Sequence, residues 1–255
     1  MNKIKQNKIT FTLILASIAI IFSSFTILSL PVLFNYKSKV DIIEKIFYKN
    51  FKIYLKSGDK ISYKPFPKPH LLVENASLSL HKSSNKRNLL NTDNLKIFIS
   101  LRDVYLRSFN NIISSQISDT NIELYMSDII EIRKHLYEKI NEPIVLNNCK
   151  IFIKNKNNEV ILISPVNKIS YKINNKNKFK QFIFDGEIFG LKYKSEWKRN
   201  YDKPTTTLQS INIFNPNIEI KNIIKFINTK KFNGLTEIVY SKDKLIYNFS
   251  FRNNS

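Results

Sequence analysis

The chain has few of the residues on which most enzyme sites depend. Its 255 residues include four glycines, one cysteine and three histidines. So few glycines argue against the Gly-rich loops that bring backbone close to a phosphate. The lone Cys149 excludes an intramolecular disulfide and a Cys-rich metal site, and we expect it to act as a small buried apolar residue.

Recognisable catalytic motifs are also missing. His70, His81 and His135 are far apart in the sequence, and none has a partner at metal-ligand or catalytic spacing. HExxH, GxSxG and Walker motifs do not occur. Asp185 and Glu187 flank a glycine, and turn chemistry explains them better than paired-acid catalysis does. We therefore predict that the protein is not an enzyme and has no catalytic residues, metal or cofactor.

What the chain does have is the composition of a folded, basic protein. Hydrophobic residues make up 43% and charged residues 24%, which is ordinary for a folded domain. The net charge is +21, from 41 Lys and Arg against 20 Asp and Glu. Lysine is abundant together with asparagine, isoleucine and phenylalanine, as in an AT-rich coding sequence. This bias in composition is the favoured explanation of the high net charge. Attraction to anionic lipid or nucleic acid is the alternative.

Residues 9–36 contain no charged side chain. As a helix, residues 9–34 would span about 39 Å, more than the ~30 Å hydrocarbon core of a bilayer. A cleaved signal peptide would have an apolar region of only ~7–15 residues, so the length favours an uncleaved signal-anchor. With three lysines before the stretch, we expect residues 1–8 inside, 9–36 across the membrane, and 37–255 as one domain on the far side.

The rest of the chain alternates between apolar and polar residues with the period of β-strands. Residues 38–50 predict an amphipathic helix closed by Asn50, residues 128–140 a second helix with an Asp128/Glu131 capping box, and 222–228 a short third one. Strands are predicted at 60–64, 76–80, 95–101, 121–126, 151–154, 160–164, 169–173, 182–188, 191–197, 210–214, 218–220, 236–240 and 245–251. The expected fold is mostly β: a long, curled antiparallel sheet with two or three short helices.

Apolar residues recur on one side of many of these strands. The predicted members of this face are Leu95, Ile97, Ile99, Leu101, Ile122, Leu124, Ile169, Tyr171, Ile173, Leu191, Tyr193 and Trp197. Such a face has to be covered by a sheet, by helices or by a ligand. Two helices of about 13 residues, roughly 20 Å each, cannot cover so many strands. The pattern alone leaves two options open: a sandwich, or a trough that holds acyl chains.

The order of these parts resembles the N-terminal region of the AsmA-like family of bacterial envelope proteins. In that family a signal-anchor, a short helix and a strand precede a segment P-x-P-x-L-x-[VL]-x-[DN]-[AV], and here residues 67–76 read PKPHLLVENA. The matching motif positions are Pro67, Pro69, Leu71, Val73 and Asn75. Residues 94–101, 119–125 and 220–234 resemble later parts of the family pattern. The chain departs from it at Asn50 and at 106–108, where the family has glycine.

The resemblance implies a domain in the periplasm, anchored in the bacterial inner membrane and related to bridge-like lipid-transfer proteins. It favours the open trough, which would hold or conduct phospholipid for outer-membrane lipid transport or assembly. The partners it implies are phospholipid, the inner membrane and other envelope proteins. Between Lys150 and Lys203, 13 basic residues interleave with aromatics, but a region outside the cytoplasm would meet no genomic nucleic acid, so no such partner is expected. The alternative is a structural or interaction protein in envelope or outer-membrane-protein assembly, without a lipid conduit.

Overall fold

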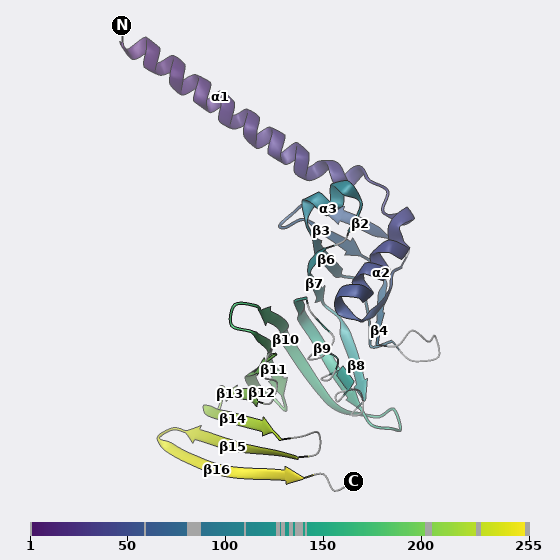
Figure 1. The fold of residues 1–255 in the computed structure, drawn as a ribbon, viewed down its shortest axis with the longest axis vertical. Helices are drawn as coiled ribbons and strands as arrows, with labels where there is room; N and C mark the ends of the chain where they lie inside the picture. Colours follow the sequence, from purple (N-terminus) through teal and green to yellow (C-terminus); the bar gives the residue numbers. More distant parts are fainter. Residues whose placement is uncertain are drawn as a thin grey trace.

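The computed structural model shows an apolar N-terminal helix joined to one large, open β-sheet (Figure 1). It describes residues 2–252 except 59, 81–87, 110, 126–127, 129–130, 133–134, 136–139, 141, 202–205 and 228–230. Most of the described chain is strand, as predicted.

Helix α1 (Asn2–Ser29) continues as a 3-10 turn, η1 (Leu30–Leu33). The segment Phe11–Leu33 is long and apolar enough to cross a membrane, and its side chains are exposed from Phe11 to Ile27, whereas Pro31 is buried. The sequence predicted a single helix over 9–34. The regular helix ends earlier because Pro31 has no N–H to donate and stands at the start of the 3-10 turn.

Helix α2 follows the turn η2 (Lys37–Lys39) and spans Val40–Phe51. It buries Ile43, Ile46, Phe47 and Phe51, so the amphipathic helix predicted over 38–50 is confirmed. The predicted C-terminal cap, Asn50, is wrong by two residues. The backbone turns left-handed at Lys52, with φ 54° and its N–H donating to the carbonyl of Tyr48, whereas Asn50 lies within the helix.

The described residues form a sheet of 16 strands. The first eight are short: β1 (Tyr54–Lys56), β2 (Ile61–Lys64), β3 (His70–Val73), β4 (Ala76–Ser79), β5 (Leu90–Thr92), β6 (Leu95–Ile99), β7 (Ile112–Ser118) and β8 (Asn121–Tyr125). The others are longer: β9 (Ile144–Lys154), β10 (Val160–Asn174), β11 (Phe179–Ile188), β12 (Leu191–Asn200), β13 (Thr206–Ile213), β14 (Ile218–Phe226), β15 (Lys231–Tyr240) and β16 (Asp243–Arg252).

Strand β9 joins two groups of short strands to a long meander, β9–β16. One group is β1, β4, β5 and β8, and the other is β2, β3, β6 and β7. The first half of β9 pairs in parallel with β7 and its second half in parallel with β8. From β9 to β16 each strand pairs antiparallel with the next. The predicted antiparallel sheet is thus correct for the meander, and the two parallel pairings at β9 were not predicted.

Three local predictions are wrong. Residues 222–226 continue strand β14 instead of forming a helix, because β13 and β15 flank them and bond their backbone. The strand predicted over 95–101 ends at Ile99, and Leu101 begins helix α3 (Leu101–Leu106), capped by Ser100, whose Oγ accepts from the Asp103 N–H at 3.1 Å. Asp185 and Glu187 lie within β11, and the turn comes later, at Gly190 with φ 79°.

The helix predicted over 128–140 is described only in part. Asp128, Glu131, Ile132 and His135 are helical, and other positions of its apolar stripe, Ile129 and Leu136, lie outside the described residues.

Candidate functional site

The register of the sheet places the predicted apolar residues on one face. Directly paired residues of neighbouring strands point to the same side of a sheet. One row of such pairs crosses twelve strands: Ile61, Val73, Leu95, Ile117, Leu146, Ile169, Phe184, Ser195, Ile211, Ile220, Ile238 and Leu245. We call this side the inner face. All the predicted residues belong to it except Leu101, which the structure places in α3.

The half of the inner face nearest to α1 is closed by protein. Leu95 and Ile97 are 0% and 1% exposed and share one core with Phe47 of α2. Five other predicted positions belong to or pack against the same core: Ile99, Ile122, Leu124, Ile169 and Ile173. In this structure these residues contact side chains of the protein, as an ordinary core does.

The backbone at Ile140 closes the same core beside β10 and β11. The Tyr171 hydroxyl and the Lys180 Nζ both donate to the carbonyl oxygen of Ile140, each at 3.1 Å. Burial lowers the pKa of Lys180. The Nε2 atom of His135 lies 3.2 Å from the carbonyl oxygen of Phe51, which connects this segment to the end of α2. Tyr171 is therefore a core residue as well.

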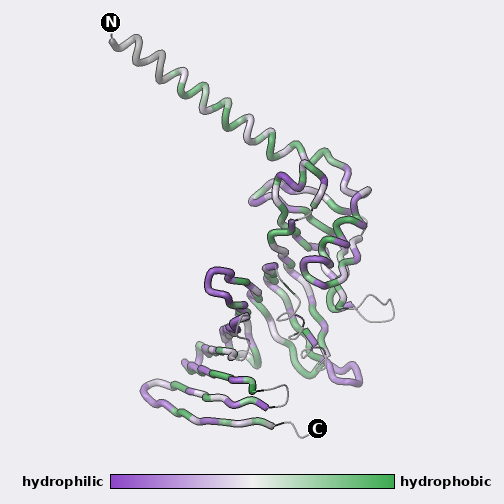
Figure 2. Tube along the Cα trace, in the orientation of Figure 1, coloured by the Kyte–Doolittle hydropathy of each residue, from purple (hydrophilic) through white to green (hydrophobic). Residues whose placement is uncertain are grey.

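The inner face of β12–β16 is different, because α1, α2 and α3 all lie at the other end of the molecule (Figure 1). We call this part the open face. Its aliphatic residues are half-buried where the sheet curls, and they include Ile211, Ile213, Ile218, Ile220, Ile224 and Ile238. Among the predicted site residues, Leu191, Tyr193 and Trp197 belong to it. Green and purple alternate along these strands in Figure 2, as expected when the two faces differ in polarity.

Aromatic rings cover the far end of the open face. The Phe232 ring stacks on Phe251 at 5.1 Å between centroids and lies 5.8 Å from Phe226 and 6.2 Å from Phe249. The guanidinium of Arg199 lies 5.5 Å from the Phe226 centroid. The sequence analysis missed these rings, although alternation in residues 245–251 could have shown them.

Gly234 provides the space for one of these rings. A Cβ on this glycine would lie 2.2 Å from the Phe249 ring. Gly234→Ala should therefore push Phe249 out of its place against Phe232 and destabilise the protein by about 1 kcal/mol. In a Phe249→Ala background the same substitution should be neutral or slightly stabilising. Thermal unfolding of the four proteins tests this, and an equal loss in both backgrounds would contradict it.

Polar side chains on the open face bond to one another. The amide of Asn222 donates to Oε1 of Gln209 at 3.0 Å and accepts from the Thr236 hydroxyl at 2.7 Å. The indole N–H of Trp197 donates to Ser195 at 2.8 Å. Burial raises the pKa of Tyr193 to about 12, so this phenol is neutral at physiological pH. The face thus combines apolar surface with polar groups that already have partners, which suits an apolar ligand.

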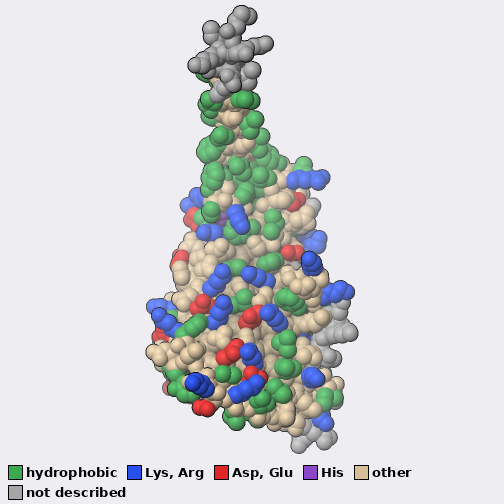
Figure 3. Space-filling view, turned by 90° about the vertical axis from the view of Figure 1, so that its left-hand side faces the viewer, with side chains coloured by type: hydrophobic (Ala, Val, Ile, Leu, Met, Phe, Trp, Pro, Cys, Tyr) green, Lys and Arg blue, Asp and Glu red, His purple; other side chains and the backbone are tan. Residues whose placement is uncertain are grey.

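The opposite, outer face of the same strands carries charge. Among the described residues, three ion pairs lie on it: Lys198–Glu196 at 2.6 Å, Lys221–Glu219 at 2.9 Å and Lys244–Glu237 at 3.1 Å. In the view of Figure 3, hydrophobic side chains cover α1, while charged side chains of both signs are scattered over the sheet. The two faces of β12–β16 therefore differ in the way expected of a sheet with one solvated side.

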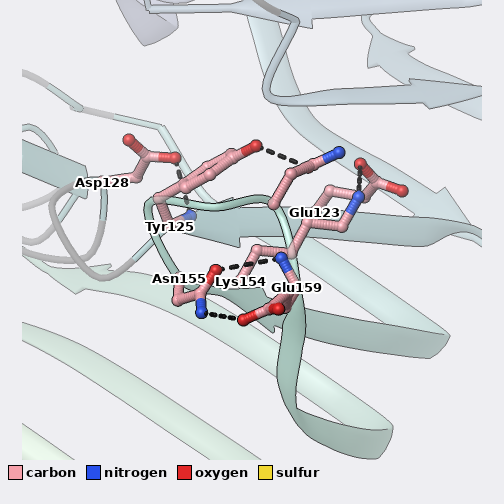
Figure 4. Close-up of polar contacts among 7 residues, drawn as sticks. Glu123, Tyr125, Asp128, Lys154, Asn155 and Glu159 are labelled. Atoms are coloured by element: carbon pink, nitrogen blue, oxygen red, sulfur yellow. Dashed lines mark hydrogen bonds and ion pairs between the residues drawn. The ribbon is translucent and has the colours of Figure 1, made fainter.

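The acidic residues around the β9–β10 turn are held by local hydrogen bonds (Figure 4). Glu123 pairs with Lys154 at 2.7 Å, Tyr125 donates its hydroxyl to Asn158 at 2.7 Å, and Asn155 donates to Glu159 at 2.6 Å. Within the part of the chain that the structure describes, no three His, Cys, Asp or Glu side chains group as metal ligands. This cluster serves to close the turn.

The residues of the Pro segment have structural roles. Pro67 and Pro69 lie in the β2–β3 loop, and Leu71 and Val73 are inner-face core residues of β3. Asn75 makes the turn into β4 with φ 53°. No protein-family model and no curated protein matches the chain, so the likeness to the AsmA-like proteins stays a resemblance.

Proposed function

We propose that α1 anchors this protein in a bacterial inner membrane and that the open face holds phospholipid acyl chains in the periplasm, in support of lipid transport or assembly of the outer membrane. The observation that supports it is the apolar, aromatic-rich inner face of β12–β16, which lies away from α1, α2 and α3 and opposite a charged outer face. A large uncovered apolar surface is typical of a binding site.

The dimensions fit this ligand. A ten-residue strand such as β15 extends about 33 Å, and five strands spaced ~4.8 Å apart span roughly 19 Å. One leaflet of the bilayer core is about 15 Å thick, which is the length that an acyl chain covers. The open face is thus long enough for a phospholipid with both chains.

Native mass spectrometry of the full chain, extracted in mild detergent, tests the proposal. Phospholipid should remain bound and be released only at high collision energy, because the apolar chains would have to leave a matching surface. The lipid-free mass alone, from a protein whose β-sheet circular dichroism is intact, would contradict it.

A second candidate function is an interaction protein in envelope assembly. It is favoured by the edge of the sheet: β16 is ten residues long and pairs with β15 on one side, at the end of the described strand order. Such an edge can accept a strand from another protein. In the same mass spectra, this alternative would give protein adducts in place of lipid adducts.

A further inference from the structure

The 3-10 turn η1, which continues α1, is packed into the domain. Pro31 is fully buried, and the hydroxyl of Tyr36 donates to its carbonyl oxygen at 2.8 Å. The Tyr36 ring in turn lies 6.2 Å from the ring of Phe109. These contacts fix the direction of the helix relative to the sheet, so the position of α1 in a bilayer would also position the domain.

Two segments of the domain reach back along α1. Phe66, in the β2–β3 loop, stacks on Phe25 of α1 with 5.8 Å between ring centroids. Tyr105, in α3, donates its hydroxyl to the carbonyl oxygen of Ile27. Ile27 comes six residues before Leu33, the end of the apolar segment, which corresponds to roughly 9 Å along the helix. Phe25 lies two residues earlier, so both contacts lie within roughly the last 12 Å of that segment.

The side chains exposed on these two segments have the composition of a membrane interface. Phe66 is 53% exposed and Leu106 is 65% exposed, although both are large and apolar. The basic residues among them are also exposed: Lys64, Lys68, Arg102 and Arg107. Aromatic and apolar side chains at headgroup depth, with Lys and Arg reaching phosphate groups, are the usual arrangement where a protein enters a bilayer.

We infer that residues 64–69 and 101–107 form a membrane foot, in which Phe66 and Leu106 insert among the lipids of the leaflet where α1 emerges. Its partner is the phospholipid bilayer itself. The inference rests on the proposed membrane anchor but is independent of lipid binding on the open face. The foot would hold the sheet at a fixed angle to the membrane, because it adds two contacts with lipid beside the single helix.

Depth-dependent quenching in vesicles tests the foot. Single cysteines replace Phe66, Leu106, Phe22 or Phe189 in a full-length Cys149→Ala background, and each carries an environment-sensitive fluorophore. Phe22 is in the middle of the apolar segment Phe11–Leu33, and Phe189 is a matched exposed aromatic in the distant β11–β12 turn. The proteins are reconstituted in phosphatidylcholine vesicles with or without lipids that carry a nitroxide on the acyl chain.

We expect nitroxide lipids to reduce the fluorescence at positions 22, 66 and 106 by about twofold or more, and to leave position 189 unchanged. If position 22 is quenched while positions 66 and 106 behave like position 189, the membrane foot is contradicted, and the membrane anchor formed by α1 is supported. If position 22 is not quenched either, the proposed membrane anchor is contradicted, and so is the foot, because it depends on that anchor. Neither result bears on the open face.

Discussion

Ile224→Asp should remove most of the bound lipid, and Ile223→Asp should leave it bound. The two residues are neighbours on β14, a strand paired on both sides, and they point to opposite faces. Ile224 lies on the open face between Thr207 and Gly234, whereas Ile223 is on the outer face and 39% exposed. An unpaired carboxylate among acyl chains costs several kcal/mol, which corresponds to a loss of affinity of at least about 100-fold.

Lipid occupancy in native mass spectra measures the effect, with circular dichroism to show that both variants keep their strands. Equal occupancy in the two folded variants would mean that lipid does not lie on the open face. Tyr171, a predicted lipid-contacting residue, is unsuitable for this comparison. It is 1% exposed and bonded to Ile140, so a charge there would disrupt the core first.

Phe47→Ala should destabilise the protein by about 3–5 kcal/mol, because it leaves a cavity between α2 and the sheet. Phe47 is 1% exposed, its ring lies 4.5 Å from that of Phe51, and it shares the core with Leu95 and Ile97. Chemical unfolding of the full chain in detergent, followed by circular dichroism, measures the change. Ile42→Ala is the control on the same helix, since Ile42 is 37% exposed and its truncation should cost about 0.5 kcal/mol or less.

The result also decides what α2 does. A fixed helix gives the large loss of stability described above. If Phe47→Ala kept its stability and bound more lipid, α2 would instead be a movable cover, and the residues beneath it, such as Leu95 and Ile97, would join the lipid-binding face.

Local patterns in the sequence determined much of this protein. The charge-free stretch at 9–36 contains the apolar part of α1, which ends at Ser29 and continues as the 3-10 turn η1. Period-two alternation fixed which side of each strand is apolar, and the register then aligned residues as distant as Ile97, Tyr171 and Trp197 on one face. Where alternation was clear, as in the strands predicted at 236–240 and 245–251, the structure has strands at those positions, and they pair with each other as β15 and β16.

Short apolar runs without a clear period were decided by tertiary structure. Ile223, Ile224 and Ile227 fit one side of a helix, and Ile224 with Phe226 fits a strand face equally well. Flanking strands on both sides of β14 settled the choice, because they bond its backbone. In the same way, the parallel pairing of β9 with β7 and β8 depends on contacts between distant segments that no local pattern encodes.

The division of the inner face is the main feature that only the tertiary structure decided. Alternation gives Leu95 and Ile224 the same expected environment, an apolar side of a strand. The fold buries Leu95 in the core that includes residues of α2 and leaves Ile224 half-buried on the open face. A pattern along one strand reports which side is apolar, but what covers that side depends on where a helix far away in the sequence packs.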